Sequence, residues 1–249
     1  MSEVLDFSQQ LCVLLALEYN CQPADFLRNN NLLTVSRLHP GRRMYNNTPH
    51  FFHMVTLGGN AVATADPVLH PFLREYMDGR PGHWLFELPN LMALEQELGR
   101  HGYTLSQTHH MFLPTRTPEV SPAFPVREIE DFAGFYDGRF PNALCPEPNS
   151  ARPDLLAICG LTEDGSIMGM AGCSRDAEDW WQIGVDVFPR YQNRGVGTAL
   201  VALLTKKILQ QGKIPFYGTS LSNYRSWNLA LSCGYRPAWV EIGAKKRRQ

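Results

Sequence analysis

Two glycines separated by one residue place the strongest constraint on how this chain can fold. Gly195 and Gly197 stand between a β-branched segment that ends at Val187 and the apolar positions of a helix that runs to Gln211. The chain must therefore leave a strand, turn and start a helix within a few residues, which is typical of α/β proteins. At a helix start several backbone N–H groups lack partners, and the helix dipole adds partial positive charge. The segment predicts a cradle for an anion such as a pyrophosphate.

The amides expected to hold the anion belong to a short run of the chain: Asn193, Arg194, Gly195, Val196, Gly197 and Thr198. The guanidinium of Arg194 adds positive charge, and the two glycines let a ligand approach the backbone closely. A Gly-x-Gly pair by itself is also compatible with a tight turn in which the glycines serve packing alone. The sequence on either side therefore has to decide between the two interpretations.

The pattern around this segment predicts that the second half of the chain contains alternating strands and helices. Strands are expected at residues 125–129, 155–161, 166–173, 180–187, 214–219 and 235–242. Helices are expected at residues 131–140, 195–211 and 225–233. Turn residues between the early strands favour antiparallel pairing. We therefore expect an α/β (α+β) fold with a mixed, mostly antiparallel sheet flanked by helices.

A proline-rich segment divides the chain. Four prolines occur from Pro114 to Pro125, and because proline fixes φ and removes a backbone donor, this stretch is expected to be an extended connector. In the first half, helices are expected at residues 1–30, 68–77 and 88–100. A hairpin is expected between residues 51–57 and 61–65, with further strands at 83–86 and 103–113.

The sequence that leads into the glycines is specific. Pro189 stands three residues before Gln192, and a Val-x-Val strand precedes both. In this context, Gln192-x-x-Gly195-x-Gly197 resembles the acyl-CoA-binding motif of the GNAT N-acetyltransferase superfamily. The first glycine of a dinucleotide-binding Rossmann fingerprint is missing, which excludes that alternative.

A second motif lies further along the chain. Asn223-x-x-Ser226-x-x-Leu229, followed by Gly234 and Tyr235, is similar to the family's signature Asn-x-x-Ala-x-x-Leu-Tyr and then Gly-Phe. The order of the predicted elements from residue 125 to residue 242 also matches the family. The resemblance covers the C-terminal half of the chain and implies a GNAT-like acyl-CoA-binding fold there.

The resemblance implies an enzyme, an N-acetyltransferase that moves the acetyl group of acetyl-CoA to a primary amine. In this family the strand before the cradle offers backbone amides to the pantetheine arm and the thioester oxygen, and by position these belong to Val185 and Val187. Gln192 belongs to the implied coenzyme site, and Asn223 and Ser226 would contact the far side of the arm. Because no cysteine occurs in the cradle, direct attack in a ternary complex is expected.

One departure from the family concerns the leaving thiolate. The family commonly has a tyrosine that protonates this group, and the present sequence has Ala230 at that position. The loss is tolerable, because a thiol has a pKa of about 8.5 and its thiolate is a fair leaving group. Ser226, Tyr224 or a water molecule are the alternatives for the proton donor.

The general base is open as well. An alkyl ammonium group has a pKa of about 10.4 and must lose a proton before it attacks. The carboxylates nearest to the strand in sequence are Glu178, Asp179 and Asp186. Asp186 is the candidate base, although its alternation with Val185 and Val187 directs its side chain to the opposite face of the sheet. A polar strand residue without a catalytic role is the other interpretation of Asp186.

The first half is interpreted as a degenerate or partial copy of the same fold. The run from Leu98 to Tyr103 echoes the run from Leu231 to Tyr235, but the Gln-x-x-Gly-x-Gly motif is absent. We predict a degenerate GNAT-like domain at residues 1–113, a connector at 114–124 and a GNAT acetyltransferase domain at 125–249. A folded first half would help to enclose the site, which favours a small-molecule amine as acceptor.

Composition narrows the remaining possibilities. The chain has 249 residues and a formal net charge of −1, so no long-range field attracts nucleic acid or an anionic membrane. No segment approaches the roughly 20 apolar residues of a membrane helix, and the N-terminus lacks the basic flank of a secretory signal. We expect a cytoplasmic protein without nucleic-acid or membrane partners, and we leave a homodimer open.

No metal site is expected. The six cysteines include no Cys-x-x-Cys pair. The pairs His50 with His53 and His109 with His110 lie on predicted strands at spacings that direct their side chains apart. The remaining alternative to an enzyme is a non-catalytic acyl-CoA-binding sensor or regulatory protein, which would share the cradle and tolerate Ala230.

Overall fold

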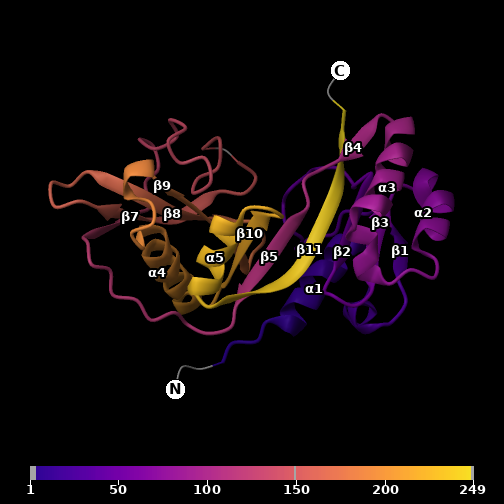
Figure 1. Ribbon diagram of the computed structural model, residues 1–249, viewed down its shortest axis with the longest axis horizontal. Coiled ribbons are helices and arrows are strands. Elements are labelled where there is room, and N and C mark those ends of the chain that lie inside the picture. Colours follow the sequence, from indigo (N-terminus) through magenta and orange to yellow (C-terminus); the bar gives the residue numbers. More distant parts are fainter. Residues whose placement is uncertain (1–3, 149, 248–249) are drawn as a thin grey trace. The chain divides into compact units, whose positions relative to one another are not determined.

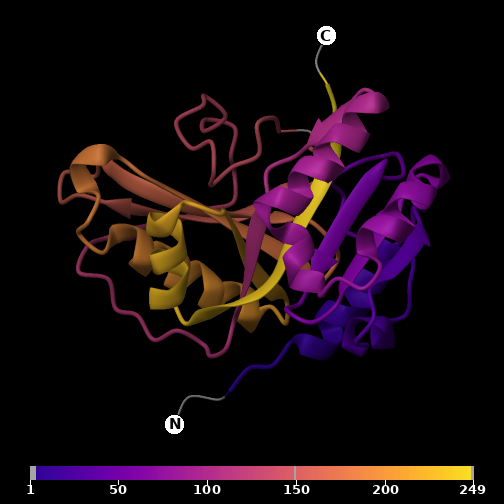
Figure 2. The same ribbon diagram turned by 45° about the vertical axis from the view of Figure 1, so that its right-hand side comes forward.

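The computed structural model describes residues 4–148 and 150–247 (Figures 1 and 2). The chain forms two compact units that do not follow chain order. Among the described residues, unit 1 contains 4–7, 43–45, 112–148 and 150–237, and unit 2 contains 8–42, 46–111 and 238–247. The domain limits expected from the sequence stay a prediction, as does the interpretation of the first half as a degenerate copy. Residues 1–3 lie outside the described residues. Two predictions include them: the N-terminal helix and the lack of a basic flank typical of a secretory signal.

The sheet of unit 1 carries the strands predicted around the glycine motif. In sheet order they are β10 (Ile214–Ser220), β9 (Trp180–Val187), β8 (Ile167–Arg175), β7 (Asp154–Leu161) and β6 (Val126–Ile129). Strands β6 to β9 pair antiparallel with one another, whereas β9 and β10 run parallel. The expected α/β class with a mixed, mostly antiparallel sheet is confirmed.

Two helices pack on one face of this sheet. Helix α4 (Val196–Gln210) follows β9, and α5 (Tyr224–Ser232) follows β10. Both lie within one or two residues of their predicted limits. The apolar side chains of α4, such as Leu200 and Leu204, share a buried core with Ile158 and Ile183 of the sheet. Helix α4 therefore begins at the carboxyl end of β9, where the predicted cradle lies.

The helix predicted at residues 131–140 is wrong, because this segment forms turns. The carboxylates of Asp131 and Asp137 each accept a hydrogen bond from the backbone N–H two residues further on, at 3.0 and 3.1 Å. Such side-chain bonds compete with the helical backbone pattern. Gly134 and Gly138 lower helix propensity further. The segment consequently reaches the sheet as a loop.

Within the described residues, the strands of unit 2 belong to the same 11-stranded sheet, whose order continues from β11 (Tyr235–Lys246) through β5 (His109–Pro114) to β10. In unit 2 the strands lie in the order β1 (Leu32–Val35), β3 (Ala61–Ala65), β2 (Phe52–Thr56) and β11, and β4 (Tyr103–Leu105) pairs with β11. Strands β1 and β3 are parallel, and the other pairs are antiparallel. Strand β11 begins in unit 1 and ends in unit 2, whereas β5 begins in unit 2 and ends in unit 1.

The helices of unit 2 lie on both faces of its part of the sheet (Figures 1 and 2). Helices α2 (His70–Met77) and α3 (Leu88–Arg100) share a buried core with one face, which includes Phe52 and Met54. Helix α1 (Ser8–Tyr19) reaches the opposite face, where Tyr19 stacks on His53 with ring centroids 5.1 Å apart. The predicted hairpin and the helix predicted at residues 88–100 are confirmed.

Other predictions for the first half are wrong. The strand expected at residues 83–86 is a 3-10 helix, Gly82–Phe86, because Pro81 starts a turn in which its carbonyl accepts a hydrogen bond from the N–H of Trp84 (3.0 Å). The strand expected at residues 103–113 is interrupted between β4 and β5. Among the described residues of the range 1–30, the helical segments are α1 and a short 3-10 helix, Pro23–Leu27. Strand β1 was not predicted.

Candidate functional site

Strands β9 and β10 pair over only the first half of β9. Their parallel register runs from Trp180 opposite Ile214 to Ile183 opposite Tyr217. Among the described residues, the register of β9 with β10 ends there, while the pairing of β9 with β8 continues to Val187. One edge of β9 therefore lacks a registered partner strand over its last four residues.

The amides of Val185 and Val187 face this edge. The N–H of Phe188 donates to the carbonyl of Met168 at 3.0 Å, so residue 188 turns its backbone toward β8. Backbone groups alternate between the two edges of a strand, which turns Val185 and Val187 the other way. The carbonyl of Val187 accepts a hydrogen bond from the side chain of Gln192 on that side, at 3.0 Å. An extended ligand along this edge would find two donors at alternate positions.

The loop between β9 and α4 leaves the start of the helix accessible. A 3-10 turn, Pro189–Tyr191, leads into residues with left-handed conformations, Asn193 at φ 59° and Gly195 at φ 77°. Gly195 is the N-cap of α4, and within the described residues no side chain caps this helix. The first turn of α4 contains no acidic residue, and Arg194 is exposed. The anion cradle expected at residues 193–198 stays a prediction, and the exposed start of α4 leaves room for it.

The two glycines of the motif have different surroundings. A Cβ at Gly195 would meet nothing within 4 Å, so this glycine provides a positive φ beside open space. A Cβ at Gly197 would lie 3.0 Å from Leu229 Cδ1 and 3.3 Å from Val187 Cγ2. Gly197 therefore lets α4 approach β9 and α5 closely. Both interpretations of the Gly-x-Gly pair therefore apply: Gly197 is needed for close packing of α4 on β9 and α5, and Gly195 leaves the backbone accessible to a ligand.

The side chain of Gln192 connects three elements around the cradle. Its Nε2 donates to the carbonyl of Val187, and its Oε1 accepts from Arg225 Nη1 at 3.4 Å. Arg225 belongs to the first turn of α5 and is exposed. Gln192 thus links the cradle loop to both β9 and α5, and its predicted contact with a coenzyme stays a prediction.

The start of α5 brings together the residues of the second motif. Asn223 is the N-cap, and its Oδ1 accepts a hydrogen bond from the N–H of Ser226 at 3.2 Å. The hydroxyl of Ser226 lies 2.6 Å from the hydroxyl of Tyr217 on β10. Burial raises the pKa of the Tyr217 phenol above its ordinary value. Tyr217 belongs to neither sequence motif, because only the fold brings it to Ser226, nine positions further along the chain.

Asp186 lies on the face of the sheet opposite α4, as its alternation predicted. Its Oδ2 accepts from the N–H groups of Asn142 and Ala143, both at 2.8 Å, and its Oδ1 accepts from Asn142 Nδ2 at 2.6 Å. A Cβ at the neighbouring Gly184 would clash with the carbonyl of Asn142, so the loop lies directly on the strand. The Asp186 carboxylate holds the loop against β9, and its role as general base stays a prediction.

The other two carboxylates near β9 form ion pairs with one lysine. Lys213 Nζ lies 2.7 Å from Asp179 Oδ1 and 3.7 Å from Glu178 Oε1. Glu178 and Asp179 directly precede β9, and Lys213 directly precedes β10. The structure therefore gives Glu178 and Asp179 a charged partner at the end of β9 remote from the cradle.

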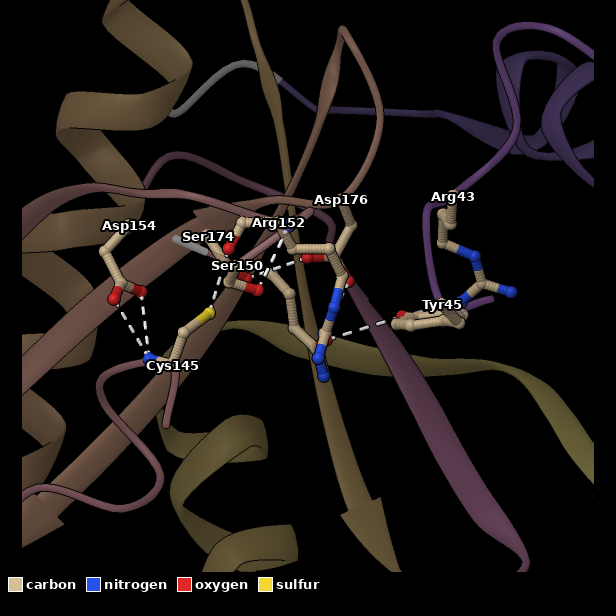
Figure 3. A network of polar contacts seen from close by, with 9 residues as sticks. Arg43, Tyr45, Cys145, Ser150, Arg152, Asp154, Ser174 and Asp176 are labelled. Atoms are coloured by element: carbon tan, nitrogen blue, oxygen red, sulfur yellow. Dashed lines mark hydrogen bonds and ion pairs between the residues drawn. The ribbon is translucent and has the colours of Figure 1, made fainter. Parts of the chain in front are cut away.

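A buried polar network beside the end of β8 has no counterpart in the sequence analysis (Figure 3). The carboxylate of Asp176 is fully buried, accepts a hydrogen bond from Ser174 Oγ at 2.7 Å and forms an ion pair with Arg152 at 3.4 Å. Burial raises the pKa of Asp176, against the opposing effect of Arg152. The guanidinium carbons of Arg43 and Arg152 each lie 4.9 Å from the ring centroid of Tyr45. The network holds residues 43–45 within unit 1.

The side chains of both histidine pairs were predicted to point apart, and the pair His50 and His53 does not. The rings of His50 and His53 stack with centroids 4.5 Å apart, because His50 precedes β2 and does not share its alternation. Among the described residues, no three His, Cys, Asp or Glu side chains gather in a group that could hold a metal ion. In the same part of the chain, no helix has the length and apolar character needed to cross a membrane.

In this α/β protein, the accessible start of α4 lies beside an edge of β9 at which the amides of Val185 and Val187 have no registered partner strand among the described residues. This arrangement suits an extended ligand with an anionic group. Residues 119–235 match the model of the Acetyltransferase (GNAT) family.

Several solved structures are similar to this chain. A GCN5-related N-acetyltransferase from Kribbella flavida is 12% identical, with a TM-score of 0.51 over 98% of this chain and 97% of that chain. One from Sphaerobacter thermophilus is 12% identical, with a TM-score of 0.49 over 100% and 96%. A putative GNAT acetyltransferase from Novosphingobium aromaticivorans is 14% identical, with a TM-score of 0.48 over 59% and 69%. No curated protein matches the chain.

Proposed function

We propose that this protein is an acetyl-CoA-dependent N-acetyltransferase that acetylates a primary amine of a small molecule by direct attack in a ternary complex. The observation that carries the proposal is the continuity of two features: the edge of β9 that ends at Val187 and the uncapped start of α4 at Gly195. A pyrophosphate at the helix start would leave an arm free to run along the strand edge. Coenzyme A has this combination of groups.

Each part of the coenzyme has a proposed partner. The amides of residues 193–198 and the guanidinium of Arg194 would bind the pyrophosphate. The amides of Val185 and Val187 would bind the arm and the thioester oxygen. A backbone donor aimed at the developing oxyanion contributes on the order of 3 kcal/mol to lowering the barrier. Asn223 and Ser226 would approach the arm from α5.

The reaction needs an unprotonated amine and an exit for the thiolate. The amine nitrogen attacks the thioester carbon, the tetrahedral intermediate collapses, and the carbon–sulfur bond breaks. The nitrogen loses one proton and the sulfur gains one. Asp186 is the proposed base. A small-molecule acceptor is favoured over a protein because the sequence predicts that a folded first half encloses the site.

Calorimetric titration with acetyl-CoA, followed by measurement of thiol release with a panel of primary amines, tests the proposal. Binding together with thiol release that depends on one amine would support it and identify the acceptor class. Binding without thiol release for any amine would favour the alternative, an acyl-CoA-binding sensor. A lack of binding would overturn the assignment of the cradle.

A further inference from the structure

The point at which β9 and β10 separate determines where the reacting end of a bound coenzyme would lie. The last residues in register are Ile183 and Tyr217, and the cradle lies at the far end of the unpaired edge, beyond Val187. A ligand with its pyrophosphate at α4 and its arm along β9 therefore directs its sulfur toward this point. Paired residues of a parallel register share a face, and Ile183 and Tyr217 both belong to the core beneath α4. Tyr217 consequently stands on the same face as Val185.

A pair of hydroxyl groups lies at this position. Tyr217 Oη and Ser226 Oγ are 2.6 Å apart, which is a short hydrogen bond between two groups that can each donate or accept. The Tyr217 side chain is 4% exposed, whereas Ser226 is half-buried. The cap at Asn223 fixes the first turn of α5 and thereby the position of Ser226. Of the two hydroxyls, Ser226 is the one that a ligand can reach.

The sequence carries two compensating departures on one face of α5. Where the family motif has alanine, this chain has Ser226, and where the motif has tyrosine, it has Ala230. The two positions are one helical turn apart and therefore on the same side of the helix. Ala230 is fully buried and belongs to the same core as Tyr217. A hydroxyl is thus lost at one position and gained at the other, with a tyrosine supplied by β10.

We propose that Ser226 and Tyr217 form a two-hydroxyl relay that delivers a proton to the coenzyme A thiolate as it leaves. The proposal rests on the function proposed above. When the carbon–sulfur bond breaks, the Ser226 hydroxyl gives its proton to the sulfur and takes the proton of the Tyr217 phenol. The resulting phenolate regains a proton from solvent through Ser226, and the proton that the attacking amine has given to its base passes to solvent. Ser226 is the catalytic donor in this step, and Tyr217 is a positioning residue that acts through it.

The test measures the thiol pKa of bound coenzyme A, because this quantity needs no acceptor. The thiolate absorbance is titrated at saturating coenzyme A as the difference between the complex and the protein alone. A hydroxyl that donates to the sulfur stabilises the thiolate, so its removal raises the thiol pKa. For Ser226→Ala and for Tyr217→Phe we expect a rise of about one unit each. The double variant should show little more than either single variant, because the two hydroxyls act in series.

Tyr235→Phe is the matched control. Tyr235 is fully buried in the same core, and its hydroxyl lies 2.7 Å from Thr205 Oγ1. Its substitution removes a bonded phenol hydroxyl from the core, keeps the ring whose centroid lies 6.3 Å from that of Tyr217, and leaves the Tyr217–Ser226 hydrogen bond in place, so the thiol pKa should not change. Unchanged thiol pKa values in Ser226→Ala and Tyr217→Phe, with coenzyme A still bound, would overturn the relay. A rise in Tyr224→Phe alone would place the donor at Tyr224 and overturn it as well. Failure of the wild-type protein to bind coenzyme A would instead contradict the proposed function.

Discussion

At the scale of single residues, Gly195 carries the anion cradle. Its φ of 77° and the open space beside it lead us to expect that Gly195→Glu will place a carboxylate where a pyrophosphate would bind. The affinity for acetyl-CoA should fall at least about 100-fold, because a like charge and a side chain then occupy the site. Isothermal calorimetry measures the affinity. The positive φ adds a stability cost of about 1–2 kcal/mol.

Gly165→Glu is the control for that strain. Gly165 has a φ of 82°, lies in the turn between β7 and β8, and also has open space around its Cβ position. The substitution therefore brings the same charge and a similar backbone cost away from the cradle. Wild-type affinity in Gly165→Glu with lost affinity in Gly195→Glu supports the cradle. Equal affinity in both variants would contradict it.

Ala230 allows a second prediction at this scale. Restoring the family's tyrosine with Ala230→Tyr would insert a large ring into a fully buried position that shares a core with Tyr217. We expect overpacking to lower the free energy of unfolding by about 1–3 kcal/mol, measured by urea denaturation. Asn228→Tyr, on an exposed position of α5, should leave stability within about 0.5 kcal/mol of wild type. An unchanged stability in Ala230→Tyr would mean that the core accommodates the ring.

At the scale of elements, Asp186 connects β9 with the loop on the opposite face. Asp186→Ala removes the acceptor of three hydrogen bonds from Asn142 and Ala143. We expect a loss of about 1–3 kcal/mol and faster hydrogen exchange at the amides of residues 142 and 143. Exchange measured by mass spectrometry or NMR should change there before it changes in β7 or β8. Unaltered exchange at both amides would contradict the anchoring role.

The same elements explain what the sequence could predict. Strand β9 and helix α3 match their predicted limits, because their apolar patterns end at strong signals, Pro189 after the strand and Gly102 after the helix. The helix predicted at residues 131–140 was wrong, because apolar spacing does not reveal that the Asp131 and Asp137 carboxylates accept hydrogen bonds from nearby backbone N–H groups. Local pattern determines such elements only where no polar side chain competes for the backbone.

The candidate site was predictable to a similar extent. The cradle and the amides of β9 lie within one continuous segment, so sequence spacing located them. The Tyr217–Ser226 pair depends on where β10 leaves β9, and the bonds of Asp186 depend on a loop 44 residues earlier in the chain. These contacts depend on packing between elements, which the order of residues does not encode locally.

At the scale of the whole molecule, the two units differ in their titratable groups. All eight histidines of the chain lie at positions 39–110 and belong to unit 2, whereas unit 1 contains none. Within unit 2, burial lowers the pKa of His50 to about 3, with a smaller contribution from the nearby His53. Burial also lowers the pKa of His110. Mild acid should therefore lower the stability of unit 2 before that of unit 1.

The sign of the effect follows from proton linkage. His50 has a pKa of about 3 in the folded state and 6.5 as its ordinary value, so between these values the unfolded chain binds a proton that the folded chain does not. The stabilisation is complete above pH 6.5 and decreases as the pH falls toward 3. The loss is about 1.4 kcal/mol per pH unit, or about 2 kcal/mol at pH 5. Hydrogen exchange, corrected for its intrinsic pH dependence, should show lower protection in α2 and α3 at pH 5, with α4 unaffected.

The variant His50→Gln isolates this contribution. Glutamine retains a polar side chain beside Asn46, whose Nδ2 lies 3.2 Å from His50 Nδ1, but it does not titrate. The decrease in protection of α2 and α3 between pH 7 and pH 5 should therefore be reduced by about 2 kcal/mol in this variant. His83→Gln, at an exposed position of the same unit, serves as the control and should retain the full decrease. If α4 lost protection first, or if His50→Gln kept the wild-type decrease, the acid sensitivity would not originate at His50. Earlier loss in α4 would place another titrating group in unit 1. A carboxylate whose pKa is lowered in the folded state, such as that of Asp137, which accepts a hydrogen bond from the backbone N–H of Arg139, would be the next to substitute.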